Sequence, residues 1–180
     1  MRLLKRSAIT VTATGATLGL FAAPALASSK PIMVKKPIMV KGPTYSYDAA
    51  YAEVKKRVVV TRAMAKESTT VLLLVSGLPS SEVGKTLGAH VHTNACGPKP
   101  ADAGPHYQNP DALPGTPLHD KEIWLDLQVH KGGYAAAQVR VPWRIAEGAA
   151  GSVVVHAHPT NHETGDAGAR LLCTTVPFGS

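Results

Sequence analysis

The sequence has few residues of several types, and each shortage excludes a class of protein. Only two of its 180 residues are cysteine, which is too few for a small domain held by many disulfides. Aromatic residues make up 5% of the chain, and no sustained helical period runs through its hydrophobic positions, which excludes a coiled coil. With 44% hydrophobic residues, the chain still has enough apolar surface for a core. We therefore expect one folded domain with an extension.

Acidic residues are missing from the first part of the chain, where none precedes Asp48. Three basic residues stand within the first six, an apolar run follows at 8–23, and small residues end this segment at Ala27. This order is typical of a secretory signal peptide, which we predict for residues 1–27. The apolar run is too short, and too often interrupted by Thr and Gly, to span a membrane. We expect a secreted or extracytoplasmic protein, in the cell envelope or periplasm, after cleavage near Ala27.

A lysine-rich motif, KPIMVK, occurs twice in succession, at 30–35 and 36–41. Its prolines exclude a helix or a central strand, so residues 28–50 are predicted to be a flexible linker. A sharper alternative makes Met33 and Met39 ligands of Cu(I), although two methionines without a fixed scaffold form a poor site. The lysines are also candidates for weak contact with an anionic cell envelope.

The net charge of +7 first suggests a nucleic acid as partner. All seven excess charges precede residue 42, however, and the rest of the chain has as many basic as acidic residues. The part that folds is formally neutral, so we expect no nucleic-acid binding.

From residue 51 onward, short β-branched runs alternate with turn residues, which is typical of strands. A turn at 131–133 predicts a hairpin, whereas the stretch 97–121 has no strand pattern and is expected to be a functional loop. We predict an all-β domain over residues 51–180, a Greek-key barrel or sandwich of about eight antiparallel strands with long loops. The strands we expect lie at 57–62, 69–76, 87–93, 122–129, 134–141, 151–157 and 171–176.

Cys96 and Cys173 are an even pair in a chain predicted to be exported, which favours a disulfide over two buried free thiols. The bond would connect the start of the long loop to the last strand.

Four histidines are candidates for a metal site. His90 and His92 are two residues apart in a predicted strand, so their side chains project from one face. His156 ends another apolar strand, and His106 lies in the long loop. A set of imidazoles suits copper, zinc, nickel or iron, and spacing alone does not choose among these metals.

Several motifs resemble those of the copper/zinc superoxide dismutases, in the order that the family has them. They are GAHVH at 88–92, AGPH at 103–106 followed by Asn109-Pro110, VVH at 154–156 and GDAGARLLC at 165–173. The resemblance covers about residues 51–178 and agrees with the all-β prediction, since this family has a sandwich architecture.

The resemblance implies roles for individual residues. His90, His92, His106 and His156 would bind copper, and Cys96 and Cys173 would form the family's disulfide. His106 and Arg170 would be catalytic, His106 by taking and returning a proton and Arg170 by binding the superoxide anion. Superoxide would then be converted to dioxygen and hydrogen peroxide as copper cycles between Cu(II) and Cu(I).

The sequence departs from the family where zinc would bind. The family has two further histidines and an aspartate after the bridging histidine. Residues 107–122 contain one histidine, His119, together with Asp111, Asp120 and Glu122. Thr160 replaces an acidic residue that would link the two metal sites. We expect no high-affinity zinc and a copper-only enzyme, similar to some bacterial members of the superfamily. His119 and Glu122 remain candidates for a weak second metal site.

A second function stays open at this point, because the same fold and ligands suit a non-catalytic protein that binds or buffers copper. His158 and His162 lie in the loop before Arg170 and would help such a protein capture copper, although exposed loop histidines are the simpler interpretation. Arg170 favours the enzyme, because copper storage has no need of a residue that orients an anion.

Overall fold

The computed structural model describes residues 38–40, 44–63 and 68–178. The predicted signal peptide and Met33 lie outside the described residues. Within the described part, no helix combines the length and the hydropathy needed to cross a lipid bilayer.

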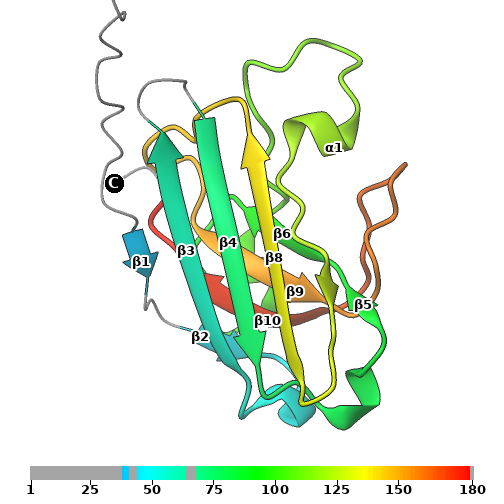
Figure 1. The fold of residues 1–180 in the computed structure, drawn as a ribbon. Helices are drawn as coiled ribbons and strands as arrows, with labels where there is room; N and C mark the ends of the chain where they lie inside the picture. Colours follow the sequence, from blue (N-terminus) through cyan, green and yellow to red (C-terminus); the bar gives the residue numbers. More distant parts are fainter. Residues whose placement is uncertain (1–37, 41–43, 64–67, 179–180) are drawn as a thin grey trace, which may run out of the picture. The chain divides into compact units, whose positions relative to one another are not determined.

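Two four-stranded antiparallel sheets form the domain, and Figure 1 shows one lying in front of the other. The front sheet has the order β1-β3-β4-β8 and the rear sheet the order β2-β10-β9-β6. The front strands are β1 (Ile38–Val40), β3 (Lys55–Ala63), β4 (Ser68–Ser76) and β8 (Tyr134–Val141). The rear strands are β2 (Thr44–Ser46), β6 (Ala89–His92), β9 (Ser152–His156) and β10 (Arg170–Thr175).

A small third sheet pairs β5 (Thr86–Leu87) with β7 (Leu127–Gln128). The described residues also contain one α-helix, α1 (Leu118–Lys121), and three short 3-10 helices: η1 (Ala49–Tyr51), η3 (Ser80–Glu82) and η4 (Pro100–Ala103). Both α1 and η4 lie in the long loop that was predicted to have no strand.

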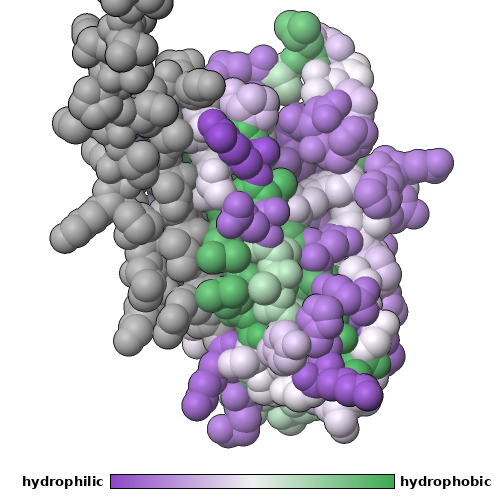
Figure 2. All heavy atoms as spheres, in the orientation of Figure 1, coloured by the Kyte–Doolittle hydropathy of each residue, from purple (hydrophilic) through white to green (hydrophobic). Residues whose placement is uncertain are grey.

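The core lies between the two sheets, because alternate residues of each strand face inward. In β4, Leu73 is 1% exposed, whereas its neighbours Leu72 and Leu74 are only half-buried on the outer face. Figure 2 shows hydrophobic side chains gathered between polar ones on this outer face. From the rear sheet, Val153 and Leu172 complete the core.

The all-β class and the antiparallel pairing are confirmed. The two four-stranded sheets of the described residues contain eight strands, the small third sheet contains two more, and none of these sheets closes into a barrel. The β8 strand has the bounds that were predicted, and the hairpin turn at 131–133 precedes it. The architecture is a sandwich.

Two strands lie inside residues 28–50, which were predicted to be a linker. β1 pairs only with β3 and β2 only with β10, so both are edge strands. An edge strand uses its hydrogen-bonding groups on one side only, which tolerates the nearby prolines that would break a central strand. The sheets therefore include backbone from before residue 51.

The strand predicted at 87–93 is interrupted at Gly88, which separates β5 from β6. The Gly88 N–H donates to the carbonyl of His158 at 2.7 Å, and its own carbonyl accepts from the His156 N–H at 2.7 Å. A Cβ at this position would lie 2.6 Å from the Cβ of Ala167. Glycine is required here because another chain segment passes so close to the backbone.

The strand predicted at 122–129 is also much shorter, since only Leu127–Gln128 is a strand. Upstream of it, Trp124 forms an isolated bridge with His90, and the Leu125 N–H donates to the Ala89 carbonyl at 2.6 Å. This segment runs beside β6 without forming a regular ladder, which brings Glu122 and Trp124 to the histidines.

Candidate metal centre

Four histidines from three parts of the chain meet at the end of the rear sheet. Their ligand atoms, one from each imidazole, all lie within 4.8 Å of one another. Two rings come from β6, one from the end of β9 and one from the long loop; they belong to His90, His92, His156 and His106. In the described part of the chain, this is the one group of three or more side chains placed to hold a metal ion.

Backbone pairing brings these rings together. β6 and β9 are neighbours in the rear sheet, and the His156 N–H bonds the Gly88 carbonyl just before β6. The loop residue His106 forms an isolated bridge with His92, and the Tyr107 N–H donates to the Val91 carbonyl at 2.8 Å. The long loop thus runs along β6 at the point where β6 has its histidines.

Backbone carbonyls orient two of the imidazoles. The Nδ1 of His92 lies 2.9 Å from the Gly104 carbonyl oxygen, and the Nδ1 of His156 lies 3.1 Å from that of Gly168. Each Nδ1–H donates to its carbonyl, which leaves both Nε2 atoms free to bind a metal. These two Nε2 atoms are 3.3 Å apart.

A buried carboxylate orients the third imidazole. Nδ1 of His106 lies 2.9 Å from Oε2 of Glu122, which also accepts the indole N–H of Trp124 at 2.7 Å. The other carboxylate oxygen accepts from the Gln108 amide at 2.8 Å. Burial alone would raise the pKa of Glu122, but the hydrogen bonds from His106, Trp124 and Gln108 outweigh it and lower that pKa.

The role of Glu122 was missed by sequence reasoning, which considered it as a ligand beside His119. The two residues differ in their surroundings: Glu122 is 4% exposed and bonded to His106, while His119 is exposed on α1. The acid nearest to His119 is Asp120, at 3.4 Å. The sequence did contain a signal for this role, because Glu122 is a charged residue at the start of an apolar run. A carboxylate buried there needs hydrogen-bond partners, which could have pointed to a neighbouring imidazole.

A hydroxyl orients the fourth imidazole. Nε2 of His90 lies 2.7 Å from Oγ1 of Thr160, and this hydroxyl donates in turn to Oδ1 of Asp126. The Thr160 N–H donates to the other Asp126 oxygen at 3.0 Å. The superoxide dismutases that this sequence resembles have an acidic residue at the position of Thr160. In this protein Thr160 instead bonds the carboxylate of Asp126, which comes from another segment.

One nitrogen in this arrangement, Nδ1 of His90, shows directly that the site suits a metal ion. Because Nε2 of His90 is held by Thr160, its Nδ1 is the atom left for coordination, and this buried nitrogen has no hydrogen-bond partner. A buried polar atom without a partner is costly in a protein interior. A metal bound to Nδ1 of His90 and to three Nε2 atoms would satisfy it, and imidazole donors suit copper.

Burial keeps the imidazoles neutral. Desolvation, aided by repulsion from neighbouring rings, lowers the pKa of His90 to about 2. Burial likewise lowers the pKa of His92 to about 3 and that of His156 to about 4, although each gains a hydrogen bond to a carbonyl. Neutral imidazole is the form that binds a metal, so protons compete weakly for these ligands.

Arg170 is fixed beside the centre by two backbone carbonyls. Its Nη1 donates to the Pro100 oxygen and its Nη2 to the Gly104 oxygen, each at 2.7 Å. The Gly104 oxygen also accepts from His92, so one carbonyl positions both the cation and a candidate ligand. Burial lowers the pKa of Arg170, yet guanidinium stays charged in proteins.

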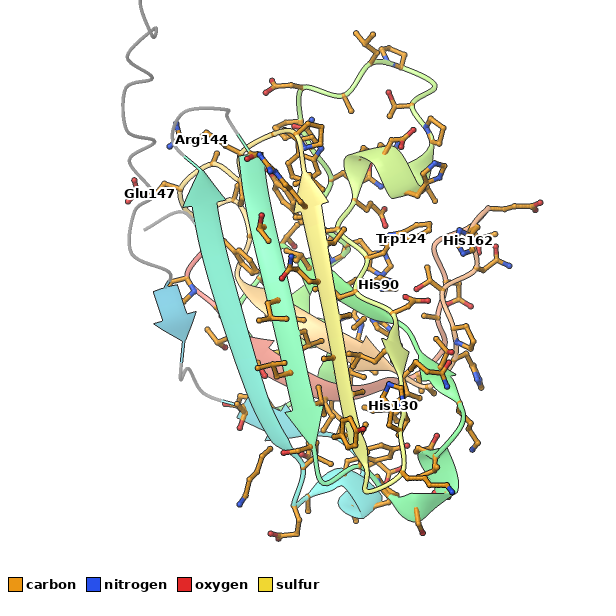
Figure 3. The ribbon with its side chains drawn as sticks, viewed as in Figure 1. His90, Trp124, His130, Arg144, Glu147 and His162 are labelled. Carbon is orange, nitrogen blue, oxygen red and sulfur yellow. A yellow bond between two sulfur atoms is a disulfide. The ribbon has the colours of Figure 1, made fainter. Side chains whose placement is uncertain are left out.

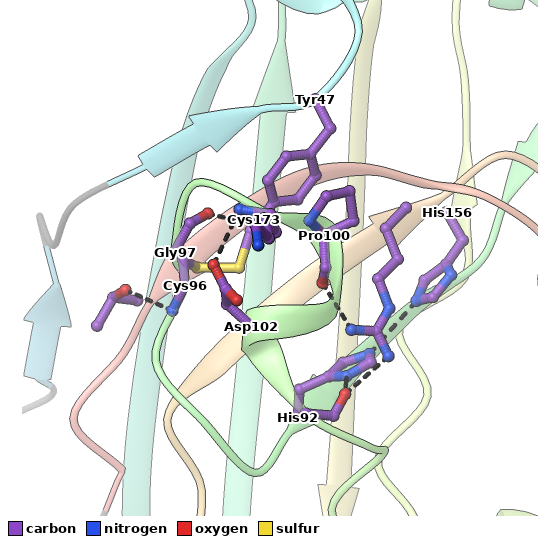
Figure 4. Close-up of a disulfide and its surroundings, with 12 residues drawn as sticks. Tyr47, His92, Cys96, Gly97, Pro100, Asp102, His156 and Cys173 are labelled. Carbon is purple, nitrogen blue, oxygen red and sulfur yellow. Dashed lines mark hydrogen bonds between the residues drawn. A yellow bond between two sulfur atoms is a disulfide. The ribbon is translucent and has the colours of Figure 1, made fainter.

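A disulfide holds the loop that supplies these carbonyls, as predicted. Cys96 and Cys173 are bonded with their Cα atoms 5.8 Å apart, joining the start of the loop to β10 (Figure 4). The Tyr47 hydroxyl donates to the Gly97 carbonyl at 3.1 Å, next to the bond. Both carbonyls that hold Arg170 follow this anchor, and Arg170 begins the strand that contains Cys173.

The remaining histidines lie on the surface. His130 is exposed and stacks on Tyr134, with ring centroids 5.2 Å apart. His158 and His162 are exposed in the loop before Arg170, as the simpler interpretation expected. The ring of His162 packs against Trp124, which lies between it and His90 (Figure 3).

The fold and the site together define an antiparallel β-sandwich protein with an all-histidine cluster, suited to hold a metal ion, beside a fixed arginine. Residues 54–176 match the copper/zinc superoxide dismutase family (SODC), and the chain belongs to that family. No curated protein is similar enough to the chain to count as a match.

The lowered pKa values predict how the metal-free protein responds to acid. An unfolded histidine takes up a proton near its ordinary pKa of 6.5, whereas His90, His92 and His156 stay neutral in the folded protein until the pH is near 4 or lower. The unfolded state therefore binds more protons between these limits. We expect the free energy of unfolding to fall as the pH falls through this window, by up to about 1.4 kcal/mol per pH unit for each histidine.

Urea unfolding of the metal-free protein at several pH values measures this dependence. Replacing His156 by Gln should make the dependence on pH shallower, because one proton-binding group is removed from the unfolded chain. Replacing the exposed His119 by Gln is the matched control and should leave it unchanged. A stability that stays constant from neutral to mildly acidic pH would contradict the prediction.

Proposed function

We propose that the protein is an exported, copper-only superoxide dismutase of the bacterial type. One observation carries the proposal: the carbonyl of Gly104 fixes both His92 of the neutral imidazole cluster and the Arg170 guanidinium. A metal-binding protein without a reaction needs only the imidazoles. A cation held beside them by two carbonyls is suited to bind a small anion.

The four imidazoles would hold the copper ion, through Nδ1 of His90 and the Nε2 atoms of the other three. When bound, copper supplies one-electron chemistry, accepting an electron from one superoxide and giving an electron to a second. Imidazole ligands are compatible with both oxidation states.

Arg170 binds and orients the anion. Two of its five N–H groups are engaged by the Pro100 and Gly104 carbonyls, so others remain to donate to superoxide. Because both engaged contacts are backbone atoms on a disulfide-anchored loop, the guanidinium is already in place before the anion arrives. The folded part of the chain has no excess of positive charge, so attraction of the anion depends on this local cation.

His106 would hold and move a proton at Nε2 whenever this nitrogen does not bind copper. Its Nδ1 is bonded to Glu122, whose negative charge stabilises the imidazolium that forms when Nε2 is protonated. The Glu122 contact also keeps the ring oriented through this change. His106 thus provides a proton close to the point where peroxide must be formed from superoxide.

The same contact supports a copper-only site. A second metal on His106 would have to bind Nδ1, which is already bonded to the Glu122 carboxylate. That carboxylate is further held by Trp124 and Gln108, so displacing it would cost three hydrogen bonds. Glu122 would thus occupy the position at Nδ1 of His106 where a second metal ion would have to bind.

The proposed role of Arg170 predicts a loss of turnover without a loss of metal. Arg170→Ala should lower the rate of superoxide dismutation by the copper-loaded protein by about tenfold to a hundredfold, and Arg170→Lys should restore only part of it. Pulse radiolysis measures the rate, and the copper content of each sample is determined beside it. Arg144→Ala is the control, because Arg144 is exposed and lies away from the histidines (Figure 3). Firm copper binding with no dismutation by the unaltered protein would show a copper-buffering protein instead.

The metal content tests the copper-only proposal separately. After exposure to both metals and dialysis, the protein should retain one copper and no stoichiometric zinc, as measured by elemental analysis. Glu122→Ala should weaken this selectivity, because it frees Nδ1 of His106 for a second ion. One zinc ion per chain in the unaltered protein would refute the copper-only claim.

Export is supported by the predicted signal peptide at 1–27 and by the disulfide, which persists in oxidising compartments. Amino-terminal sequencing of the protein recovered outside the cytoplasm should begin at or near Ser28. A chain that keeps residues 1–27 after export would count against cleavage near Ala27. After cleavage, the lysine repeat at 30–41 would lie next to the new amino terminus, where its positive charges suit contact with an anionic envelope.

A further inference from the structure

The charges of the folded part of the chain cancel in number, but they are unevenly distributed. The four strands of the front sheet contain five basic residues and no acidic one: Lys55, Lys56, Arg57, Arg62 and Arg140. All 12 acidic residues lie elsewhere in the chain. The front sheet is therefore positively charged, whereas the rest of residues 42–180 has more acidic than basic residues.

Strand pairing combines these charges with an apolar area on the outer face of the front sheet. Leu72 and Leu74 of β4 lie on this face, where each is half-buried. Residues that stand opposite each other in neighbouring antiparallel strands share a face. The pairing places three basic residues along this face of β4: Lys55 opposite Ser76, Arg57 opposite Leu74 and Arg140 opposite Thr70.

The outer face is accessible to a partner. Lys55 and Arg140 are exposed, and no ion pair among the described residues includes either of them. Tyr134 stands opposite Ser76 and is 54% exposed. Figure 2 shows apolar side chains gathered in one area of this face, with polar ones beside them. A tyrosine has an apolar ring and a polar tip, which suits a boundary between water and lipid.

The lysine repeat is continuous with the same sheet. Its second copy contains β1, which pairs with β3 so that Met39 stands opposite Val59, and Val59 stands opposite Leu72. The row that contains Leu72 therefore continues through two apolar residues into the repeat. The repeat has four lysines and no acidic residue, and Lys36 and Lys41 flank β1 in the sequence. Positive charge thus extends from the repeat into the front sheet.

The histidine cluster faces away from this surface. In the rear sheet, Val91 of β6 and Val155 of β9 belong to the core between the sheets. Side chains alternate along a strand, so the neighbouring His92 and His156 project from the other face of the rear sheet. A partner on the outer face of the front sheet would leave the cluster on the opposite side of the sandwich.

We propose that the outer face of the front sheet, together with the lysine repeat, docks the protein on an anionic lipid surface. Each lysine or arginine held near such a surface strengthens binding about fivefold. Stable attachment takes a second signal besides charge, which the apolar area provides. A polyanion without lipid, such as polyphosphate, would bind the charges but would leave Leu72, Leu74 and Tyr134 in contact with water.

Co-sedimentation of the exported protein with lipid vesicles tests this docking. The protein should bind vesicles that contain one third phosphatidylglycerol in phosphatidylcholine, and should not bind vesicles of phosphatidylcholine alone. Added salt should weaken the binding, because it screens the charges. The double variant Lys55→Gln, Arg140→Gln should lower the partition coefficient roughly tenfold or more, since two charges are removed from the face.

The double variant Lys85→Gln, Lys99→Gln is the matched control, because both lysines are exposed outside the front sheet and the net charge changes equally. It should bind within about twofold of the unaltered protein. Leu74→Thr tests the apolar area, since threonine is also favoured in strands but buries less apolar surface. It should lower the partition coefficient several-fold and leave the dependence on salt unchanged.

Equal loss of binding in the control would overturn the proposed face, because it would show a response to net charge alone. An unaltered partition coefficient in Lys55→Gln, Arg140→Gln would overturn it as well. Absence of binding to the anionic vesicles, or equally tight binding to polyphosphate that Leu74→Thr leaves unchanged, would overturn lipid as the partner. Circular dichroism shows whether each variant is folded. The metal-free protein has the same outer face, so failure to dock and failure to dismute superoxide are separate outcomes.

Discussion

The structure around the centre depends on one constraint: four imidazoles within 4.8 Å of one another must be oriented, and three of them, those of His90, His92 and His156, are also buried and neutral. Burial makes the charged forms costly, and each ring also has a second nitrogen that needs a partner. The protein supplies a partner to each ring: a backbone carbonyl to two of them, a carboxylate to the third and a hydroxyl to the fourth. Every one of these partners leaves the remaining nitrogen directed into the cluster.

The partners also connect the cluster to the rest of the fold. The Gly104 carbonyl couples His92 to Arg170, and the disulfide from Cys96 to Cys173 fixes the loop that contains Gly104. Glu122 couples His106 to Trp124, whose half-buried indole reaches the surface. One shared acceptor on each side thus relates the ligands to the cation that would meet an anion and to an indole that reaches the surface.

Much of the fold could be predicted because it is local. Short β-branched runs between turn residues predicted the strands, and β8 has the predicted bounds. The errors arose where backbone pairing is not local. Gly88 interrupts a strand because His158 and Ala167 approach it, and β1 and β2 are strands because β3 and β10 pair with them.

The sequence by itself determined the class of fold, the choice of four histidines as candidate metal ligands and the pairing of the two cysteines. Each of these depends on residue type and spacing. The tertiary structure decided which nitrogen of each ring is free, that Glu122 holds His106 and that Thr160 joins His90 to Asp126. These contacts link residues far apart in the chain, such as His90 and Thr160, separated by 70 positions. No local pattern encodes such a pair, because a hydrogen bond in a buried site depends on where the whole chain places both partners.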